Sequence, residues 1–199
     1  PPPPPPFFLM IRRPPIPSHF PYTTLFRSGL GGISLPDSQK ISEKQSEYMN
    51  LIAEIMDIRK RGEKPVAYIR TYGCQQNVAD SEKIKGMLEQ SGFEFADEPD
   101  NADFILFNTC AVREHAEDRV FGNVGALKNL KRKHPQILIA LCGCMMEQEH
   151  VANKIYKSFP FVGLVFGTHS LHHFPELMYN ALLDGKRVFE RDKIGRAHV

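Results

Sequence analysis

The stretch Val66-Ala67-Tyr68-Ile69, followed by the turn Tyr72-Gly73-Cys74, is the pattern on which the fold prediction rests. A short β-like apolar run leads into a turn, a cysteine and then a helix-like segment. The same order recurs twice, with Cys110 after the run at residues 104–107 and Cys144 after the run at 137–140. If the three runs are neighbouring parallel strands, the three thiols gather at one carboxyl edge, where open α/β sheets bind ligands.

Strand-like and helix-like segments alternate along the rest of the chain. Strands are expected at residues 66–70, 93–95, 104–107, 136–141, 161–166 and 188–189. Helices are expected at residues 77–92, after Cys110, at 147–157 and at 171–183. This alternation predicts an α/β fold with a mostly parallel sheet, right-handed crossovers and flanking helices, the layering of Rossmann-like and flavodoxin-like domains.

Two local features of the helices carry specific predictions. Asn77, with Asp80 three residues later, resembles a capping pair that opens a helix. Gly122 and Gly125 lie inside the helix marked by an apolar repeat of Val112, Ala116, Val120, Val124 and Leu127. Each glycine costs about 1 kcal/mol relative to alanine, so we expect another backbone to approach that helix closely.

An amphipathic helix is predicted before the first strand, at residues 41–61, after a loop at residues 29–39. Its apolar face comprises Tyr48, Leu51, Ile52, Ile55, Met56 and Ile58. Gly62 and Pro65 end the helix. Residues 29–63 are therefore interpreted as an N-terminal helical extension that packs on the domain at residues 64–192.

The two ends of the chain, residues 1–28 and 193–199, are interpreted as translated sequencing adapter and expected to be disordered. Residues 24–28 can be encoded by ACG CTC TTC CGA TCT, and residues 194–197 by ATC GGA AGA GCA. GCTCTTCCGAT in the first is the reverse complement of ATCGGAAGAGC in the second. A proline-rich tail and a targeting peptide are the alternatives for residues 1–28. On the adapter interpretation the protein is a fragment truncated near Asp192.

Composition excludes several classes of protein. No apolar run is long enough to span a bilayer. The 4 cysteines are too few and too unevenly spread for a secreted disulfide scaffold, which indicates a reducing compartment. Without the five basic residues of the two ends, 20 of the 25 Lys and Arg face 23 Asp and Glu. The interior is therefore slightly acidic, and bulk charge gives no case for a polycation that binds nucleic acid.

The cysteines favour a metal or iron–sulfur site over the alternatives. Cys142 continues an apolar run and is interpreted as a small buried hydrophobe. Three convergent thiols at Cys74, Cys110 and Cys144 suit a metal or an iron–sulfur cluster. Zinc is the main rival, although the cysteines are 36 and 34 residues apart and His115 is the best candidate for a fourth ligand. A cysteine nucleophile explains one thiol and not three.

Nucleotide binding has weaker support. The first strand-to-helix turn contains neither Gly-x-Gly-x-x-Gly nor Gly-Lys-Ser/Thr, so no phosphate cradle is visible. A basic group lies at the C-terminal end of the helix after Cys110 and comprises Lys128, Lys131, Arg132, Lys133 and His134. We expect it to complement the helix dipole, with phosphate contact as the alternative.

Three segments carry a family resemblance: residues 71–77, 108–114 and 143–148, which contain Cys74, Cys110 and Cys144 in order. Together with residues 166–169 and 171–172, they resemble the N-terminal domain of the radical S-adenosylmethionine methylthiotransferases. The resemblance covers about residues 64–190. It is strongest to the branch that methylthiolates a prenylated adenosine of tRNA, while the ribosomal-protein and threonylcarbamoyl-adenosine branches share the cysteines.

The resemblance implies that Cys74, Cys110 and Cys144 ligate an auxiliary 4Fe–4S cluster with one iron left open for a sulfur donor. It also implies a second 4Fe–4S cluster and S-adenosylmethionine in a domain that these residues do not contain, so the fragment is expected to be inactive alone. The expected parent enzyme is cytoplasmic, acts on tRNA without a membrane, and is monomeric. A zinc-stabilised α/β binding module without catalysis remains the alternative.

Overall fold

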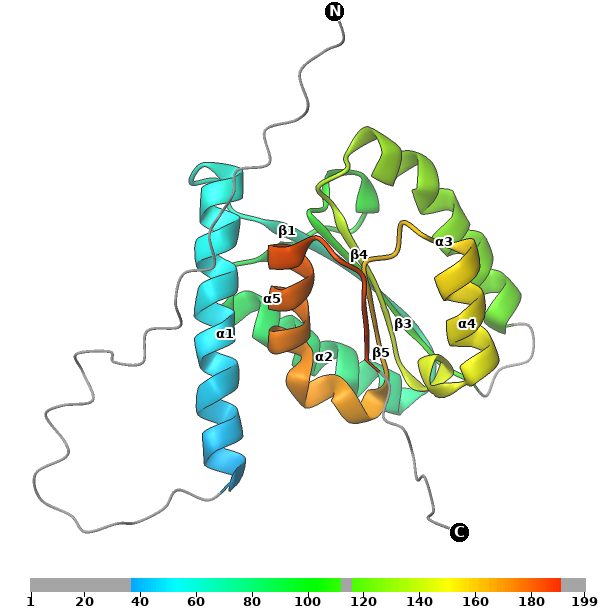
Figure 1. Ribbon diagram of the computed structural model, residues 1–199, viewed down its shortest axis with the longest axis horizontal. Helices are drawn as coiled ribbons and strands as arrows, with labels where there is room; N and C mark the ends of the chain where they lie inside the picture. The colour runs from blue at the N-terminus through cyan, green and yellow to red at the C-terminus, as the bar shows by residue number, and fades with distance from the viewer. Residues whose placement is uncertain (1–36, 112–115, 191–199) are drawn as a thin grey trace, which may run out of the picture. The chain divides into compact units, whose positions relative to one another are not determined.

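The computed structural model describes residues 37–111 and 116–190 (Figure 1). The interpretations of both chain ends and of Val112 and His115, and the part of the predicted loop before residue 37, therefore lie outside the described residues. The loop predicted at residues 29–39 is wrong in its last three residues, because α1 already begins at Asp37. Within the described part of the chain, no helix combines the length and apolar content needed to cross a membrane.

A six-stranded sheet forms the centre of the described structure, and all five of its strand pairings are parallel. Its strands are β1 (Val66–Tyr72), β2 (Glu94–Phe95), β3 (Phe104–Thr109), β4 (Leu138–Cys142), β5 (Leu164–Phe166) and β6 (Val188–Glu190). The spatial order is β2-β1-β3-β4-β5-β6. Its first five strands follow the flavodoxin-like order, in which the sheet switches direction of growth between β1 and β3. The predicted parallel α/β sheet is confirmed.

Helices cover both faces of the sheet (Figure 1). The α-helices are α1 (Asp37–Lys60), α2 (Gln75–Gln90), α3 (Ala116–Lys133), α4 (Glu149–Ser158) and α5 (Phe174–Asp184). Successive strand residues point to opposite faces, so Phe104 and Leu106 enter the core under α1, α2 and α5. Ile105 and Phe107 enter the other core, under α3 and α4. The central strands β3, β4 and β5 are therefore buried on both sides, as is usual in parallel sheets, whereas the edge strands β2 and β6 are partly exposed.

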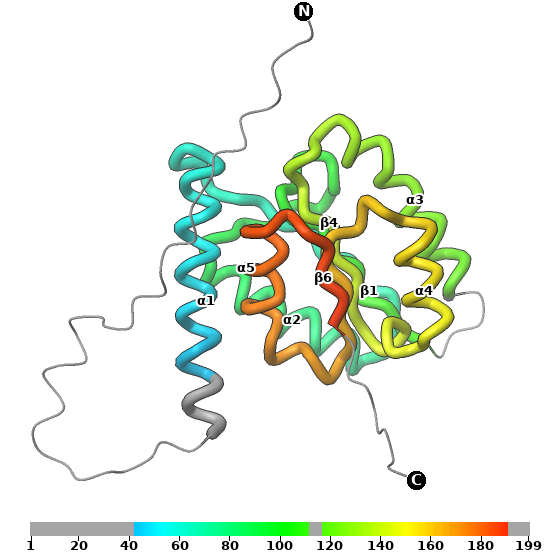
Figure 2. The backbone as a smooth tube through the Cα atoms, in the orientation of Figure 1, coloured from blue at the N-terminus to red at the C-terminus, as the bar shows by residue number. Residues whose placement is uncertain are grey.

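Helix α1 packs beside α5, on the side of the sheet away from α3 and α4 (Figure 2). Ile52 and Met56 are 1% and 4% exposed and belong to the same core as the strands. The predicted amphipathic face is thus confirmed in its centre. Ile58 was wrongly placed on that face, because it is 69% exposed. It lies two residues after Met56, which turns it to nearly the opposite side of the helix.

The prediction that another backbone approaches Gly122 and Gly125 is wrong within the described residues. A Cβ atom at Gly122 would meet no atom within 4 Å, and at Gly125 only a ring carbon of Phe159 at 4.0 Å. The helix tolerates both glycines without needing either for close packing.

Short 3-10 helices displace several predicted helix starts. They are η2 (Pro99–Asn101), η3 (Cys144–Glu147) and η4 (Thr168–His173). The helix predicted at residues 147–157 begins only at Glu149, after η3, and the one predicted at 171–183 is divided between η4 and α5. Gly185 ends α5 in the left-handed conformation, with φ of 59°, as predicted for that stop.

Candidate functional site

The three cysteines Cys74, Cys110 and Cys144 follow the ends of β1, β3 and β4, which are adjacent strands. In the register, Tyr72 pairs with Thr109 and Asn108 pairs with Cys142. The three thiols therefore leave the sheet at almost the same level. Neighbouring strands are about 4.8 Å apart, so this register brings the cysteines to one mouth at the carboxyl edge. The predicted positions at the carboxyl ends of strands are confirmed.

Cys74 is the N-cap residue of α2 and is exposed. Its thiol donates a hydrogen bond to Oδ1 of Asn77 at 3.2 Å. Hydrogen bonds from the backbone amides, first of Asn77 and then of Gln76, lower the pKa of the Cys74 thiol. Free amides at a helix N-terminus stabilise negative charge, so this cysteine is held in a setting that favours thiolate.

Cys110 is buried, while Cys144 is half-buried in η3. The backbone N–H of Ala111 donates to Sγ of Cys144 at 3.1 Å. Desolvation by burial raises the pKa of Cys144, and hydrogen bonding to Cys110 and the charges of Cys110 and Cys74 raise it further. Negative charge on Cys110 or Cys74 therefore disfavours a second thiolate at Cys144.

Cys142 differs from the other three. It is 1% exposed and belongs to the core under α1, α2 and α5. Burial raises the pKa of its thiol well above the ordinary value, so it stays protonated. The interpretation of Cys142 as a small buried hydrophobe agrees with this environment.

A buried polar network lies beneath the cysteine turns and joins α2 to β3. The side-chain amide of Asn77 donates to Oδ1 of Asn108 at 2.8 Å and to the carbonyl of Thr109 at 3.2 Å. In return, the amide of Asn108 donates to the carbonyl of Asn77 at 2.8 Å and to Oγ of Ser81 at 3.0 Å. Asn77 and Asn108 are 2% and 0% exposed, so water cannot replace these hydrogen bonds. Each residue therefore depends on the other for a hydrogen-bond partner.

The prediction that Asn77 and Asp80 form a capping pair is wrong. Helix α2 begins earlier, at Gln75, and its N-cap residue makes no side-chain cap hydrogen bond. Asn77 instead lies in the first turn and uses its side chain for the tertiary contact with Asn108. The Asn77 side chain therefore bonds to Asn108, 31 residues away in sequence, and does not cap its own helix.

Two glycines before the cysteines make this packing possible. Gly143 has φ of 103°, and a Cβ atom there would collide with Asn108 Oδ1 and the backbone of Thr109. At Gly73, a Cβ atom would come within 2.6 Å of Asn77 Oδ1. Both turns can therefore approach the buried amides only because they lack a side chain.

A cleft of about 850 Å³ opens beside the cysteines, with Cys74 and Cys144 in its lining. One wall is α2, and the other is η4, which contributes Thr168, His169 and His172. The sequence analysis included these residues only in the family resemblance and gave them no place at the site, because a 3-10 helix has no recognisable apolar period.

Glu147 belongs to the segment 143–148 of the family resemblance, but the sequence analysis gave it no role at the site. Its Oε1 atom is buried and has no hydrogen-bond partner among the described residues. A side chain at Gly167 would collide with this carboxylate, so the strand-to-helix turn after β5 closes directly over it.

The residues at this edge that could hold a metal or a cluster are Cys74, Cys110 and Cys144, and all four cysteines of the chain are free thiols. Across residues 37–111 and 116–190, no three His, Cys, Asp or Glu side chains are arranged to hold a metal ion. A structural zinc takes four donors, whereas thiolates are the usual ligands of an iron–sulfur cluster. His115, the candidate fourth zinc ligand, is outside the described residues.

Comparison with known proteins gives a family match and a set of close relatives. Residues 66–167 match the family described as Uncharacterized protein family UPF0004. A Clostridium perfringens protein named tRNA-2-methylthio-N(6)-dimethylallyladenosine synthase is 49% identical over 135 residues, which are 68% of this chain and 30% of the relative.

Two further relatives have the same name. The protein of Caldicellulosiruptor saccharolyticus is 53% identical over 131 residues, covering 66% of this chain and 28% of the relative. That of Bacillus licheniformis is 42% identical over 169 residues, covering 85% of this chain and 33% of the relative. The chain thus spans about a third of the length of these relatives.

Proposed function

The chain belongs to the protein family UPF0004, and from that premise we propose that it is the N-terminal auxiliary-cluster domain of a tRNA methylthiotransferase. The observation that carries the proposal is the meeting of three free thiols at the ends of the adjacent strands β1, β3 and β4. The relatives' name, tRNA-2-methylthio-N(6)-dimethylallyladenosine synthase, supports tRNA as the substrate and a prenylated adenosine as the target.

In this proposal, Cys74, Cys110 and Cys144 are the ligands of a 4Fe–4S cluster. Three thiolates leave one of the four irons without a protein ligand, and that iron supplies a binding place for a sulfur donor. The amides of Gln76 and Asn77 favour the charged form of Cys74. The N–H of Ala111 does the same for Cys144 by donating to its sulfur. Amide hydrogen bonds to ligand sulfurs also tune the potential of a cluster.

The remaining chemistry belongs to other parts of the proposed parent enzyme. Its radical domain binds a second 4Fe–4S cluster and S-adenosylmethionine, and the four cysteines of this chain do not contain the Cys-x-x-x-Cys-x-x-Cys spacing for that cluster. We therefore expect no methylthio transfer by this chain alone. The parent enzyme is expected to work on tRNA in the cytoplasm as a monomer.

Anaerobic reconstitution with iron and sulfide tests the proposal. We expect a charge-transfer band near about 400 nm, typical of cysteine-ligated clusters, together with about four irons per chain. Cys74→Ala, Cys110→Ala and Cys144→Ala should each weaken the band strongly. Cys142→Ala is the matched control and should leave it nearly unchanged, because that thiol lies in the apolar core.

Metal analysis of the same samples distinguishes the cluster from the alternative, a structural zinc. One zinc per chain, retained without any iron-dependent band, would replace the cluster by a zinc-stabilised binding module. The branch is tested on the full-length enzyme, by offering it prenylated tRNA, threonylcarbamoylated tRNA and ribosomal protein as alternative substrates.

A further inference from the structure

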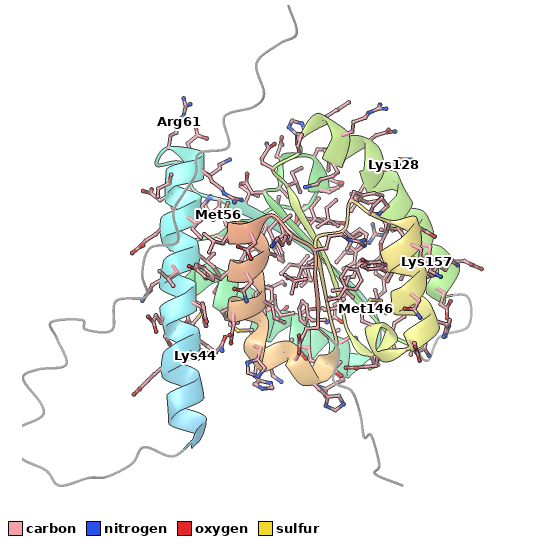
Figure 3. All side chains as sticks on the ribbon, in the orientation of Figure 1. Lys44, Met56, Arg61, Lys128, Met146 and Lys157 are labelled. Atoms are coloured by element: carbon pink, nitrogen blue, oxygen red, sulfur yellow. The ribbon has the colours of Figure 1, made fainter. Side chains whose placement is uncertain are left out.

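A group of exposed basic residues lies on α3 and α4. We define the α3–α4 basic surface by five exposed cations on the C-terminal halves of the two helices: Lys128, Arg132, Lys133, Lys154 and Lys157. Lys128 and Lys157 mark it in Figure 3, on the side of the sheet opposite to α1.

The charge of this surface is all of one sign. Residues 119–146 contain five Lys and Arg and no Asp or Glu, and residues 150–175 contain two Lys and no acid. The acids of α3 and α4, Glu117, Asp118 and Glu149, lie in the first turns, toward the cysteine edge. The basic surface is therefore a local feature of a domain whose overall charge is close to neutral.

Side chains of α3 contact side chains of α4 and of Phe159, the residue that follows α4. The rings of Phe121 and Phe159 stack with centroids 5.7 Å apart. The ammonium of Lys154 lies over the Phe121 ring at 3.9 Å. At the other end, His150 contacts Glu117 at 3.1 Å.

The helix dipole favours the three cations in the last turn of α3, Lys131, Arg132 and Lys133, as predicted. The ammonium of Lys131 is also occupied within the domain, because it donates to the carbonyls of Pro135 and Ile137 at 2.5 and 2.6 Å. Lys128 lies before the last turn, where the dipole has little effect. Elsewhere, Lys60, Lys64 and Lys85 are paired with carboxylates. Within the described residues, no such ion pair involves Lys128, Arg132, Lys133 or Lys157.

Helix α3 extends the domain away from the strand that precedes Cys110. Helix α3 begins six residues after Cys110 and ends at Lys133, and its 18 residues span about 27 Å at about 1.5 Å each. An RNA with one nucleotide at the cysteine edge and a helical stem along α3 would bring its phosphates to this surface. Unpaired Lys and Arg without neighbouring acids provide the complementary charge.

We propose that the α3–α4 basic surface binds the phosphate backbone of the RNA whose adenosine is modified at the cysteine edge. This inference rests on the proposed function and names the part of the domain that holds its substrate. The contacts are to phosphate, so they position the RNA without reading its sequence.

The test measures binding of the full chain to a fluorescently labelled RNA hairpin with an adenosine beside its anticodon triplet, by anisotropy at several salt concentrations. The test variant combines Lys128→Ala, Arg132→Ala and Lys133→Ala. The control combines Lys44→Ala, Lys64→Ala and Lys85→Ala, which removes equal charge from lysines that pair with acids. We expect the test variant to bind about tenfold or more weakly, with a salt slope shallower by about two to three units. The control should keep the wild-type slope.

Equal slopes for wild type, test variant and control would overturn the proposal, as would the absence of RNA binding by the wild-type chain. Binding to vesicles of phosphatidylserine and phosphatidylcholine that depends on the same three cations, without RNA binding, would overturn it in favour of a membrane surface. The iron–sulfur band of each variant is recorded in parallel. A band that forms normally while RNA binding is insensitive to these cations refutes this inference and leaves the proposed function standing.

Discussion

Asn77 and Asn108 show how much of the site depends on single buried side chains. Both side chains are almost fully buried. The Asn77 amide donates to Oδ1 of Asn108 and the Asn108 amide donates to the backbone carbonyl of Asn77, both at 2.8 Å. Asn77 also accepts the thiol hydrogen of Cys74, so the network reaches the exposed sulfur. A pair of this kind holds α2 against the end of β3, and it thereby sets where Cys74 and Cys110 lie relative to each other.

Replacing Asn108 by alanine should destabilise the domain by about 1–3 kcal/mol, because the buried polar groups of Asn77 and Ser81 lose their partner. Urea unfolding measures the change. Asn129→Ala, on the exposed side of α3, is the control and should change stability by less than about 0.5 kcal/mol. Equal effects of the two substitutions would contradict a structural role for the buried amide pair.

Among the helices, α1 was predicted as an N-terminal extension, and its contacts decide whether it is part of the folded domain. Its Ile52 and Met56 lie in the same core cluster as the strand residues Ala67 and Phe104. Arg59 near its end donates to the carbonyl of Leu182 in α5 at 2.5 Å. Both contacts indicate that the helix is integrated with the sheet and stabilises it.

Two isoleucines of α1 form a matched pair for testing that integration. Ile52→Ala should cost about 2–4 kcal/mol of global stability, because it leaves a cavity under a residue that is 1% exposed. Ile58→Ala, at 69% exposure on the same helix, should change stability by less than about 0.5 kcal/mol. Denaturant unfolding followed by a probe on the sheet distinguishes the cases. If the unfolding transition reported by the probe on the sheet were unchanged in Ile52→Ala, α1 would be an independent appendage.

The two proposed sites lie at different ends of the domain. The cysteine mouth lies at the carboxyl edge of the sheet, where the order of strands reverses between β1 and β3. The basic surface lies toward the C-terminal ends of α3 and α4, which run back from that edge. A proposed reaction site at one end and a proposed phosphate-binding surface at the other suit a substrate much larger than the cleft.

Removing the proposed cluster should weaken the whole fold, because its three ligands come from three strands and bind metal only when the strands are assembled. Each kcal/mol of lost binding should lower the unfolding midpoint by about 2–4 °C in a domain of this size. Anaerobic thermal unfolding before and after iron chelation measures the difference. Identical midpoints would contradict coordination by the folded domain.

The fold class was within reach of local patterns. Apolar runs before each cysteine, helix-like repeats after it and glycine stops predicted the parallel sheet and most helices. The errors have physical causes. Asn77 was interpreted as a cap because its neighbours in sequence permit one, whereas its true partner is Asn108. Ile58 was assigned to the apolar face because hydrophobicity alone does not report which side of a helix is covered.

Local sequence alone thus specified an alternating α/β chain with a thiol after each of three strands, because the period of a strand or helix is set by neighbouring residues. Tertiary structure decided that β1, β3 and β4 are adjacent, that Asn77 and Asn108 join beneath the thiols, and that side chains of α3 and α4 contact each other. These features depend on residues tens of positions apart, and only packing of the assembled sheet and helices selects such partners.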